Sequence, residues 1–190
     1  NDLTVTDSMN FFNYGYFYMG GGVAVGDFNS DGLEDVFFTG NMVENQLYMN
    51  TGDLQFKNIT KLSGIESQQK WYTGATIADV NQDGLEDIYI SVAGRWASRK
   101  NELWINQGPD EAGVPQFSEE ADAYGIADSS YSIQSVFFDY DNDGDLDLLV
   151  GNYEPTRFDS YSFEYKKKLD NNTWTASDHL YQNDGNGNFT

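Results

Sequence analysis

The sequence contains no cysteine, which excludes a disulfide framework and any metal site built from thiolates. This absence leaves the cellular compartment open. The sequence also lacks a run of 18 apolar residues, so it predicts no membrane-spanning helix. Its first residues, NDLTVTDSMN, lack the pattern of a signal peptide, and we expect them to be the interior of a longer protein or the start of a processed one.

Basic residues are scarce in this chain, with 10 lysines and arginines against 31 acidic residues and a formal charge of −21. Nucleic acids and anionic membrane surfaces both require basic patches, so the charge argues against either partner and allows a cation. With 39% hydrophobic and 16% aromatic residues, the chain is too rich in core-forming side chains for a disordered acidic protein. Its 190 residues suffice for one or two domains with a sizeable core.

The most informative feature of the sequence is a run of aspartates that occurs three times. The runs read DFNSDGLED at 27–35, DVNQDGLED at 79–87 and DYDNDGDLD at 139–147, and they share the pattern D-x-[ND]-x-D-G-x-x-D. We call them loops 1, 2 and 3, and we number their positions 1 to 9. The first aspartates are 52 and 60 residues apart, and an apolar or small-residue segment precedes and follows each loop. Such a repeat indicates a repeated structural unit.

Each repeat predicts four short strands separated by turns. After the two segments that flank the loop come a third segment, QLYMN, ELWIN or HLYQN, and a fourth that contains phenylalanine. Four antiparallel strands at a period of about 50 residues are typical of a β-propeller blade. A β-sandwich is the alternative, but it does not require three near-copies of one turn. We therefore predict an all-β fold in which residues 1–66, 67–126 and 127–190 form three four-stranded blades.

Three blades do not close a ring, because propellers usually have about four to eight. We therefore expect the three blades to be one partial propeller domain. The other blades would belong to the same longer chain, to copies of this chain or to another protein in a larger complex.

The aspartate loops predict one calcium site in each blade. Close carboxylates repel one another, and a bound Ca²⁺, which takes about six to eight oxygen ligands, would offset that repulsion. Positions 1, 3, 5 and 9 carry side-chain oxygen, the glycine at position 6 permits a sharp turn with positive φ, and position 7 would offer its backbone carbonyl. The predicted ligands are Asp27, Asn29, Asp31, Leu33 and Asp35 in loop 1, Asp79, Asn81, Asp83, Leu85 and Asp87 in loop 2, and Asp139, Asp141, Asp143, Asp145 and Asp147 in loop 3.

Other interpretations of these loops fit the sequence less well. An EF-hand needs a bidentate glutamate at position 12, where Phe38, Ile90 and Val150 stand within apolar segments. A plain turn explains one such run, because aspartate and asparagine bond to their own backbone, but it does not explain three copies with one ligand spacing. Mg²⁺ demands tighter octahedral geometry than Ca²⁺. The predicted cofactor is therefore Ca²⁺, with about three ions, one per blade.

The segments GDFNSDGLEDVFF, ADVNQDGLEDIYI and FDYDNDGDLDLLV resemble the FG-GAP or VCBS repeats of integrin α-subunit propellers and of many secreted bacterial proteins. The endings LYMN…F and LYQNDGNGNF are most similar to the bacterial VCBS-type subgroup, which is common in Bacteroidota. The resemblance implies a propeller of about seven or eight blades, with Ca²⁺ in the hairpin between the first two strands of each blade. It also implies a secreted protein or one on the outer surface of a bacterium.

The loops and the resemblance together favour a non-catalytic module that binds a protein or a glycan at the cell surface. Long loops on a rigid scaffold often carry function, and the longest connection here is the insert at 153–178. The aromatic side chains of the insert would either stack on a partner or pack the insert onto its own blade. A structural subunit of a large surface complex is a further possibility. The insert holds the basic residues Arg157, Lys166, Lys167 and Lys168 and the aromatic residues Tyr153, Phe158, Tyr161, Phe163, Tyr165 and Trp174.

The alternative in a different class is an enzyme, such as a calcium-dependent polysaccharide lyase, and the sequence gives it little support. No G-x-S-x-G, H-E-x-x-H or P-loop motif occurs. The one histidine, His179, stands where the other repeats have Gln46 and Glu102, which indicates a structural position at the start of a strand. The other clustered candidates for a base are Arg95, Arg99 and Lys100.

The aromatic stretch FFNYGYFYMGGG at 11–22 precedes the first predicted strand. We expect alternate rings to pack between blades rather than to bind sugar. We expect the triple glycine to lie on the crowded inner strand, where backbones approach closely.

Overall fold

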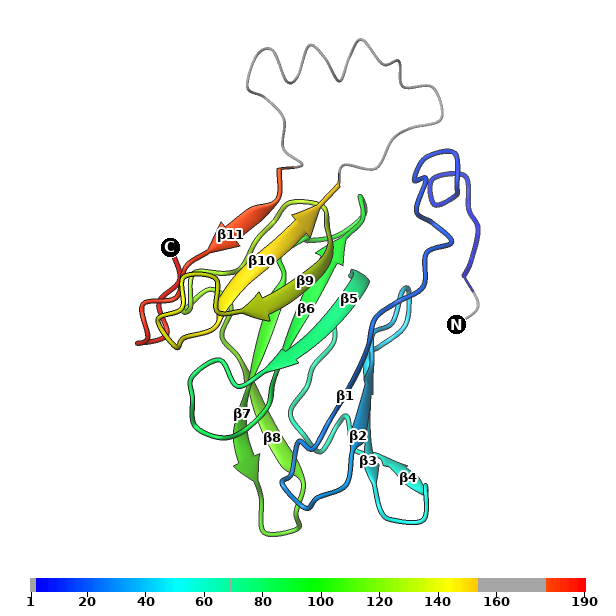
Figure 1. Ribbon diagram of the computed structural model, residues 1–190. Coiled ribbons are helices and arrows are strands. Elements are labelled where there is room, and N and C mark those ends of the chain that lie inside the picture. The colour runs from blue at the N-terminus through cyan, green and yellow to red at the C-terminus, as the bar shows by residue number, and fades with distance from the viewer. Residues whose placement is uncertain (1–2, 69, 154–176) are drawn as a thin grey trace.

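The computed structural model describes residues 3–68, 70–153 and 177–190, and within these ranges it has strands and turns but no helix (Figure 1). The described part of the chain therefore offers no helix that could cross a membrane. Three antiparallel sheets follow one another along the chain, and the strands of each sheet pair in chain order. The predicted all-β fold built from propeller blades is confirmed, whereas the number of blades in a complete ring stays a prediction.

Blades 1 and 2 have four strands each, and the described part of blade 3 has three. Blade 1 consists of β1 (Val23–Gly26), β2 (Asp35–Phe38), β3 (Gln46–Asn50) and β4 (Phe56–Asn58). Blade 2 consists of β5 (Trp71–Ala78), β6 (Asp87–Ala93), β7 (Glu102–Pro109) and β8 (Pro115–Glu119). Blade 3 consists of β9 (Ser132–Phe138), β10 (Asp147–Asn152) and β11 (His179–Tyr181). A bridge between Asn183 and Phe189 stands in place of its fourth strand. The predicted blade boundaries at 66 and 126 stay predictions.

Two apolar cores lie between successive blades. Because side chains alternate between the two faces of a strand, each sheet presents one row of apolar residues to each neighbour. Phe37 and Leu47 of blade 1 share a buried cluster with Ile88 of blade 2. Tyr89, the next residue on β6, joins a second cluster with Leu148 of blade 3. Blade 2 is thus covered on both faces.

The turn that leaves each blade also bonds to the next blade. The carbonyl of Ser63 accepts a hydrogen bond from the N–H of Phe117 at 2.9 Å, and the carbonyl of Tyr124 accepts one from the N–H of Phe189 at 3.1 Å. The residues that follow are the Gly-Ile pairs at 64–65 and 125–126, whose isoleucines are buried in the first and second cluster, respectively. The same covalent link and the same hydrogen bond therefore join both pairs of blades.

The inner strands of adjacent blades approach backbone to backbone, as the sequence predicted for the glycines before β1. A Cβ atom on Gly22 would lie 2.3 Å from the backbone nitrogen of Ala75. On Gly74 of blade 2, a Cβ would lie 3.0 Å from the carbonyl oxygen of Ile133 in blade 3. Gly20, by contrast, has no atom within 4 Å of such a position. Only part of the triple glycine is therefore required by packing.

The aromatic stretch before β1 packs at one end of the blades and not along an inner strand. Tyr14 and Phe17 are fully buried, and their ring centroids lie 5.5 and 5.4 Å from that of Trp71 at the start of β5. Trp96, from the connection between β6 and β7, lies 5.3 Å from Tyr14. Tyr18 remains 68% exposed. The expectation that alternate rings pack between blades is therefore wrong, because the two buried rings are three residues apart and cover the ends of the strands.

One repeated hydrogen bond closes the connection between the second and third strands of every blade. The backbone N–H groups of Gly40, Val92 and Asn152 donate to Oδ1 of Asn45, Asn101 and Asp178, respectively. Each bond joins the two ends of the connecting loop next to the sheet. Connecting loops of very different length therefore fit the same arrangement of strands. Most of the predicted insert at 153–178, including Arg157, Phe158, Tyr161, Phe163, Tyr165, Lys166, Lys167, Lys168 and Trp174, lies outside the described residues.

Replacing Gly22 by alanine tests the close contact between inner strands. The new methyl group would meet the backbone of Ala75, which cannot rotate away, so we expect Gly22→Ala to lower the free energy of unfolding by about 1–3 kcal/mol. Gly20→Ala is the matched control, and we expect it to be neutral or slightly stabilising. Urea unfolding followed by circular dichroism measures both variants. Equal stabilities of the two would contradict the proposed contact.

Candidate metal centre

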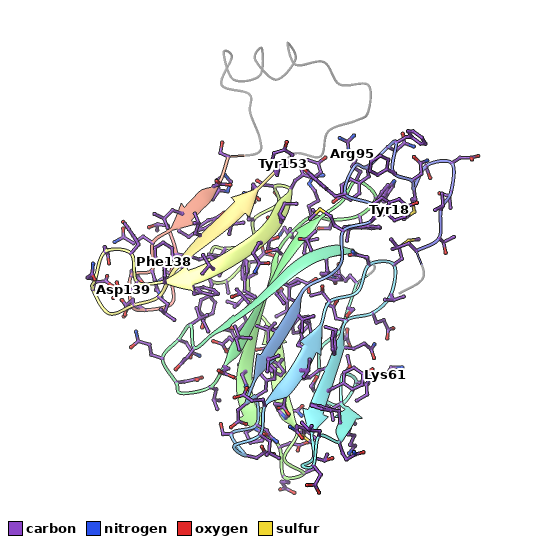
Figure 2. All side chains as sticks on the ribbon, turned by 45° about the vertical axis from the view of Figure 1, so that its right-hand side comes forward. Tyr18, Lys61, Arg95, Phe138, Asp139 and Tyr153 are labelled. Carbon is purple, nitrogen blue, oxygen red and sulfur yellow. The ribbon has the colours of Figure 1, made fainter. Side chains whose placement is uncertain are left out.

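Each aspartate loop connects the first and second strands of its blade. In Figure 1 the three loops lie at the lower and left ends of the sheets, and Figure 2 labels Asp139, the first residue of loop 3, at this end. The connections between second and third strands leave from the opposite ends, where Figure 2 labels Arg95 and Tyr153. The loops thus form a row along one rim of the molecule.

The three loops have the same backbone conformation. The glycine at position 6 has a φ of 86° in Gly32, 88° in Gly84 and 98° in Gly144, which confirms the prediction of a left-handed turn there. No atom within 4 Å would meet a Cβ at these glycines, so the φ angle alone requires glycine. Position 4 is also left-handed, with φ of 58° to 63° in Ser30, Gln82 and Asn142. The sequence did not reveal this, because serine and glutamine have little preference for that region.

The aspartate at position 1 is held by backbone N–H groups of its own loop. In loop 1, the two oxygens of Asp27 accept hydrogen bonds from Asp31 N at 3.0 Å and Gly32 N at 2.8 Å. Asp79 and Asp139 make the equivalent pairs of bonds in loops 2 and 3. The loop folds around the carboxylate, so the N–H donors offset part of the repulsion among the aspartates.

The aspartate at position 5 accepts a hydrogen bond from the backbone N–H at position 7 in all three loops. The donors are Leu33, Leu85 and Asp145, with distances of 2.8, 2.9 and 3.0 Å. These bonds fix the N–H groups of position 7, while the role of its carbonyl stays a prediction. The carboxylate of Asp145 also accepts a hydrogen bond from Gln82 Nε2 at 2.7 Å, which links loop 3 to loop 2.

Position 3 distinguishes loop 3 from the other two. Asn29 and Asn81 each donate an amide N–H to the position-5 carboxylate, at 3.0 and 2.9 Å. Loop 3 has Asp141 instead, and its carboxylate accepts from Gln182 Nε2 at 2.7 Å. Desolvation raises the pKa of Asp141, and the charges of Asp143 and Asp147 raise it further. Loop 3 therefore has a negative charge at position 3, where loops 1 and 2 have a neutral amide.

The aspartate at position 9 is completely buried and ties the loop to the third strand. Oδ1 of Asp35, Asp87 and Asp147 accepts a hydrogen bond from the backbone N–H of Asn50, Asn106 and Asn183, respectively, at 2.8, 2.8 and 2.9 Å. In loops 2 and 3, Oδ2 accepts a further bond from the N–H at position 2. Position 9 is thus a structural anchor as well as a predicted ligand.

Burial raises the pKa of two of these anchors. The pKa of Asp87 is raised to about 7, because desolvation and the charges of Asp83 and Asp79 outweigh its hydrogen bonds to Asn106 and Val80. The pKa of Asp35 is raised to about 6, again mainly by burial. Its Oδ2 is buried and has no hydrogen-bond partner among the described residues. A cation beside these carboxylates would favour their charged form.

The residues of loop 3 fit a hard cation such as Ca²⁺. One carboxylate oxygen from each of Asp139, Asp141 and Asp147 lies within 4.8 Å of the others, although the three residues come from different positions of the loop. Oxygen donors of this kind suit Ca²⁺, and each carboxylate oxygen that accepts one N–H keeps a second lone pair. The structure thus brings together predicted ligands at positions 1, 3 and 9 of loop 3.

Sequence reasoning missed the role of the asparagine that ends the repeated segments LYMN, LWIN and LYQN, although the repeat contained the signal. The Nδ2 atoms of Asn50, Asn106 and Asn183 donate to the carbonyl at position 8 of their loop, at 3.1, 3.2 and 3.2 Å. Nδ2 of Asn106 donates in addition to the carbonyl of Phe28 in loop 1, at 2.8 Å. This asparagine therefore joins two blades as well as two strands.

The candidate catalytic residues form structural pairs away from the loops. His179 begins β11, as predicted, and its Nδ1 lies 2.6 Å from Oδ2 of the buried Asp128. Burial would raise the pKa of Asp128, but hydrogen bonds from Ser130, Asn152 and His179 outweigh it and lower the pKa. The guanidinium of Arg99 lies 4.4 Å from the ring centroid of Tyr131, and Lys100 pairs with Asp122 at 2.7 Å.

The fold and the three loops define an all-β protein of propeller-type blades with one acidic hairpin loop per blade. Residues 13–90 match the family model of the FG-GAP-like repeat. This range includes loops 1 and 2, so the match agrees with the resemblance drawn from their sequences.

Comparison with curated proteins adds two kinds of relative. The chain is 29% identical over 141 residues to cartilage acidic protein 1 of Xenopus tropicalis, which covers 71% of this chain and 20% of the relative. The human cartilage acidic protein 1 gives the same identity and coverage. Integrin alpha-4 of Xenopus laevis is 28% identical over 149 residues, which cover 70% of this chain and 14% of the relative. The chain thus spans a fifth or less of the length of these relatives.

Replacing the third-strand asparagines one at a time tests their role. Asn106→Ala removes the bond to Phe28 of blade 1 in addition to the bonds within blade 2, whereas Asn50→Ala removes only bonds within blade 1. We expect both variants to be destabilised and Asn106→Ala to be worse by about 1 kcal/mol, the net value of one hydrogen bond. Chemical unfolding under identical calcium conditions measures the difference. A variant Asn106→Ala that is no less stable than Asn50→Ala would contradict the role of this bond between blades.

Proposed function

We propose that this protein is a non-catalytic, adhesion-type interaction module whose blades are stabilised by Ca²⁺ in the three aspartate loops. The observation that carries the proposal is the repeated loop itself. All three loops share the same left-handed residues at positions 4 and 6, and in loop 3 three carboxylates converge within 4.8 Å. Three equivalent acidic turns on successive sheets are explained by a repeated cation site better than by three independent turns.

Calcium would add its positive charge to the hydrogen bonds by which backbone N–H groups already hold the carboxylates of each loop. The residues of each loop would hold the ion with carboxylate and amide oxygens, and the buried position-9 aspartate would transmit the constraint to the third strand. We propose all fifteen predicted ligands for this role, including the position-7 carbonyls. The ion would supply positive charge, while the chain supplies the rigid frame.

We further propose that the protein works outside the cell. Weak calcium modules fill only where calcium is plentiful, which supports an extracellular or cell-surface location. One relative is named for cartilage and another is an integrin, and neither name denotes an enzyme. The finer assignment to the bacterial VCBS-type subgroup rests on the LYMN…F and LYQNDGNGNF segments. A protein or glycan partner would bind at the rim opposite the loops, where the insert at 153–178 begins.

The end blades carry faces that match the buried joints, and we propose that they receive further blades. Val136 and Leu180 of blade 3 occupy the repeat positions of Ala24 and Leu47, which blade 1 buries against blade 2, yet they are 47% and 46% exposed. Val23 and Val25 of blade 1 occupy the repeat positions of Ala75 and Ile77, which blade 2 packs against blade 1, and they are 54% and 50% exposed. The two exposed faces are therefore the two complementary halves of one joint, as in a head-to-tail interface.

A calcium titration of the wild-type chain and one loop variant tests the metal assignment. After treatment with a chelator, we expect the melting temperature to rise with added Ca²⁺, because an ion that binds only the folded state stabilises it. Asp141→Asn gives loop 3 the asparagine that loops 1 and 2 have at position 3. We expect this variant to be more stable than wild type without calcium, because it relieves repulsion, and to bind calcium in loop 3 about tenfold more weakly.

The control for this titration is Glu44→Gln, which makes the same change of charge at an exposed position in the connection between β2 and β3. We expect its melting temperature to follow that of wild type at every calcium concentration. A melting temperature that does not respond to millimolar Ca²⁺ in the wild-type chain would overturn the proposed calcium sites.

Self-association tests the two exposed blade faces. If they are complementary, the isolated chain should associate reversibly in sedimentation experiments, and Val136→Lys should weaken that association by about tenfold or more. Phe11→Lys, which changes a side chain of similar exposure outside both faces, is the control. A chain that stays monomeric at concentrations of about 100 μM would contradict this part of the proposal.

A further inference from the structure

The rim opposite the aspartate loops contains a pocket with an aromatic wall. Its volume is about 290 Å³, and it is lined by Met9, Met42, Lys70, Trp71, Trp96 and Ala97. These residues come from the N-terminal segment, the second-to-third-strand connections of blades 1 and 2, and the start of β5. Figure 2 places Arg95, the neighbour of Trp96, at the end of the molecule away from Asp139. The size is at the lower end of the range for small-molecule pockets, about 300–1,000 Å³.

A second pocket of about 300 Å³ adjoins the first and has a polar lining. Lys70 lines both pockets, and we call the pair the cleft, with an aromatic half and a polar half. Carboxylate, amide, hydroxyl and ammonium groups surround the polar half. Its lining includes Glu66, Gln68, Ser98, Lys100, Glu119 and Asp122.

The side chain of Lys70, at the junction of the two halves, is buried and electrically compensated. Its Nζ lies 2.7 Å from Oε1 of Glu102, and it donates to the carbonyl of Lys100 at 3.1 Å. The other oxygen of Glu102 accepts a hydrogen bond from Trp104 Nε1 at 3.0 Å. Because each member of this buried pair has its partners, the junction is a fixed neutral group. It does not provide an uncompensated positive charge for an anionic ligand.

Trp71 in the aromatic half has a buried donor without an acceptor. Its side chain is only 4% exposed, and its indole N–H has no hydrogen-bond partner among the described residues. Leaving such a donor unpaired costs about 1–3 kcal/mol. Because this N–H is itself buried, a ligand oxygen would accept from it only if the ring turns toward the pocket, and a purely apolar ligand would gain nothing there.

We propose that this cleft binds a neutral saccharide of two or more units. One sugar ring would place its apolar C–H face against Trp96, and a hydroxyl oxygen would accept from the indole of Trp71 once that ring turns its N–H toward the pocket. The next unit would exchange hydrogen bonds with the polar half of the cleft. Apolar walls with a few fixed polar groups are the usual composition of ligand pockets. The inference deepens the proposed function of an interaction module by assigning it a ligand class.

The charge around the cleft argues for neutral over acidic sugars. In the polar half, Lys70 is compensated by Glu102 and Lys100 pairs with Asp122 at 2.7 Å, so the carboxylates of Glu66 and Glu119 remain in excess. The chain as a whole carries a formal charge of −21. Uronate or sulfate groups would be repelled by the carboxylates of the polar half and by the net charge of the chain. Neutral rings rich in hydroxyl groups would not be repelled in this way.

The test uses the full chain with calcium present and isothermal titration against defined oligosaccharides. The probes are hexasaccharides of β-1,4-glucose, β-1,4-mannose, β-1,4-N-acetylglucosamine and α-1,6-glucose, with hexagalacturonic acid as the acidic counterpart. We expect at least one neutral probe to bind more tightly than about 1 mM and the acidic probe to bind more weakly. No binding of any neutral probe at about 5 mM, or preference for the acidic one, would overturn the proposal.

Substitutions at Trp96 and Phe56 locate the binding to the cleft. Trp96 is partly exposed in a connecting loop, so Trp96→Ala should fold and weaken the neutral saccharide about tenfold or more, while Trp96→Phe should recover part of the affinity. Phe56→Ala removes a ring that is 43% exposed on β4, outside the cleft, and should leave the affinity within about twofold. Equal losses in Trp96→Ala and Phe56→Ala would overturn the assignment.

The saccharide assignment and the calcium assignment can fail separately. Thermal melts with and without calcium report on the loops, whereas the titrations report on the cleft at the opposite rim. A chain that melts higher with calcium but binds no neutral saccharide would retain the proposed calcium sites and refute the ligand class. Saccharide binding without any calcium response would support the cleft and refute the calcium sites.

Discussion

The buried aspartate at position 9 is the interaction on which each blade depends. In every blade its carboxylate accepts the backbone N–H of the asparagine that ends the segment LYMN, LWIN or LYQN, so a residue at the start of the second strand fixes the segment of the third strand. The side chain is fully buried in all three blades. A buried carboxylate is costly unless it is hydrogen-bonded or paired with positive charge, which makes this contact both an anchor and a reason for a cation nearby.

The joints between blades extend the same arrangement. Asn106 donates to blade 1 from β7, and Gln82 donates to loop 3 from loop 2. The Gly-Ile turns add a main-chain hydrogen bond to each joint, beside the apolar clusters. Because the loops contact one another at one rim, ordering one loop would also support its neighbour. The opposite rim carries connections between second and third strands and the aromatic pocket.

Much of the fold and of the loop chemistry could be predicted because the repeat is local. Three copies of one nine-residue pattern were enough to predict the strand order and the left-handed glycine at position 6, whereas the ligand positions stay a prediction. The left-handed residue at position 4 was missed, because Ser30 and Gln82 adopt that conformation only in the context of the loop. The side-chain bonds of Asn106 were missed, because its partners at Phe28 and Glu86 are far away in sequence.

The cleft could not be predicted for the same reason. Trp71 and Trp96 lie in different segments of blade 2, and the rings that complete their cluster come from Tyr14 and Phe17 before the first strand. The apolar pattern of 11–22 indicated burial, but no sequence period relates it to β5. Contacts between segments so far apart depend on how blades stack, which a pattern within one repeat does not specify.

The most direct test of this account is the number of calcium ions that the folded chain holds. Native mass spectrometry of the chelator-treated protein after stepwise addition of Ca²⁺ counts the ions per molecule. The account predicts occupancy that rises to about three, one for each aspartate loop, with the protein remaining folded throughout. A chain that stays free of calcium at saturating concentrations would show that backbone N–H groups alone hold the aspartate loops, and it would contradict the account.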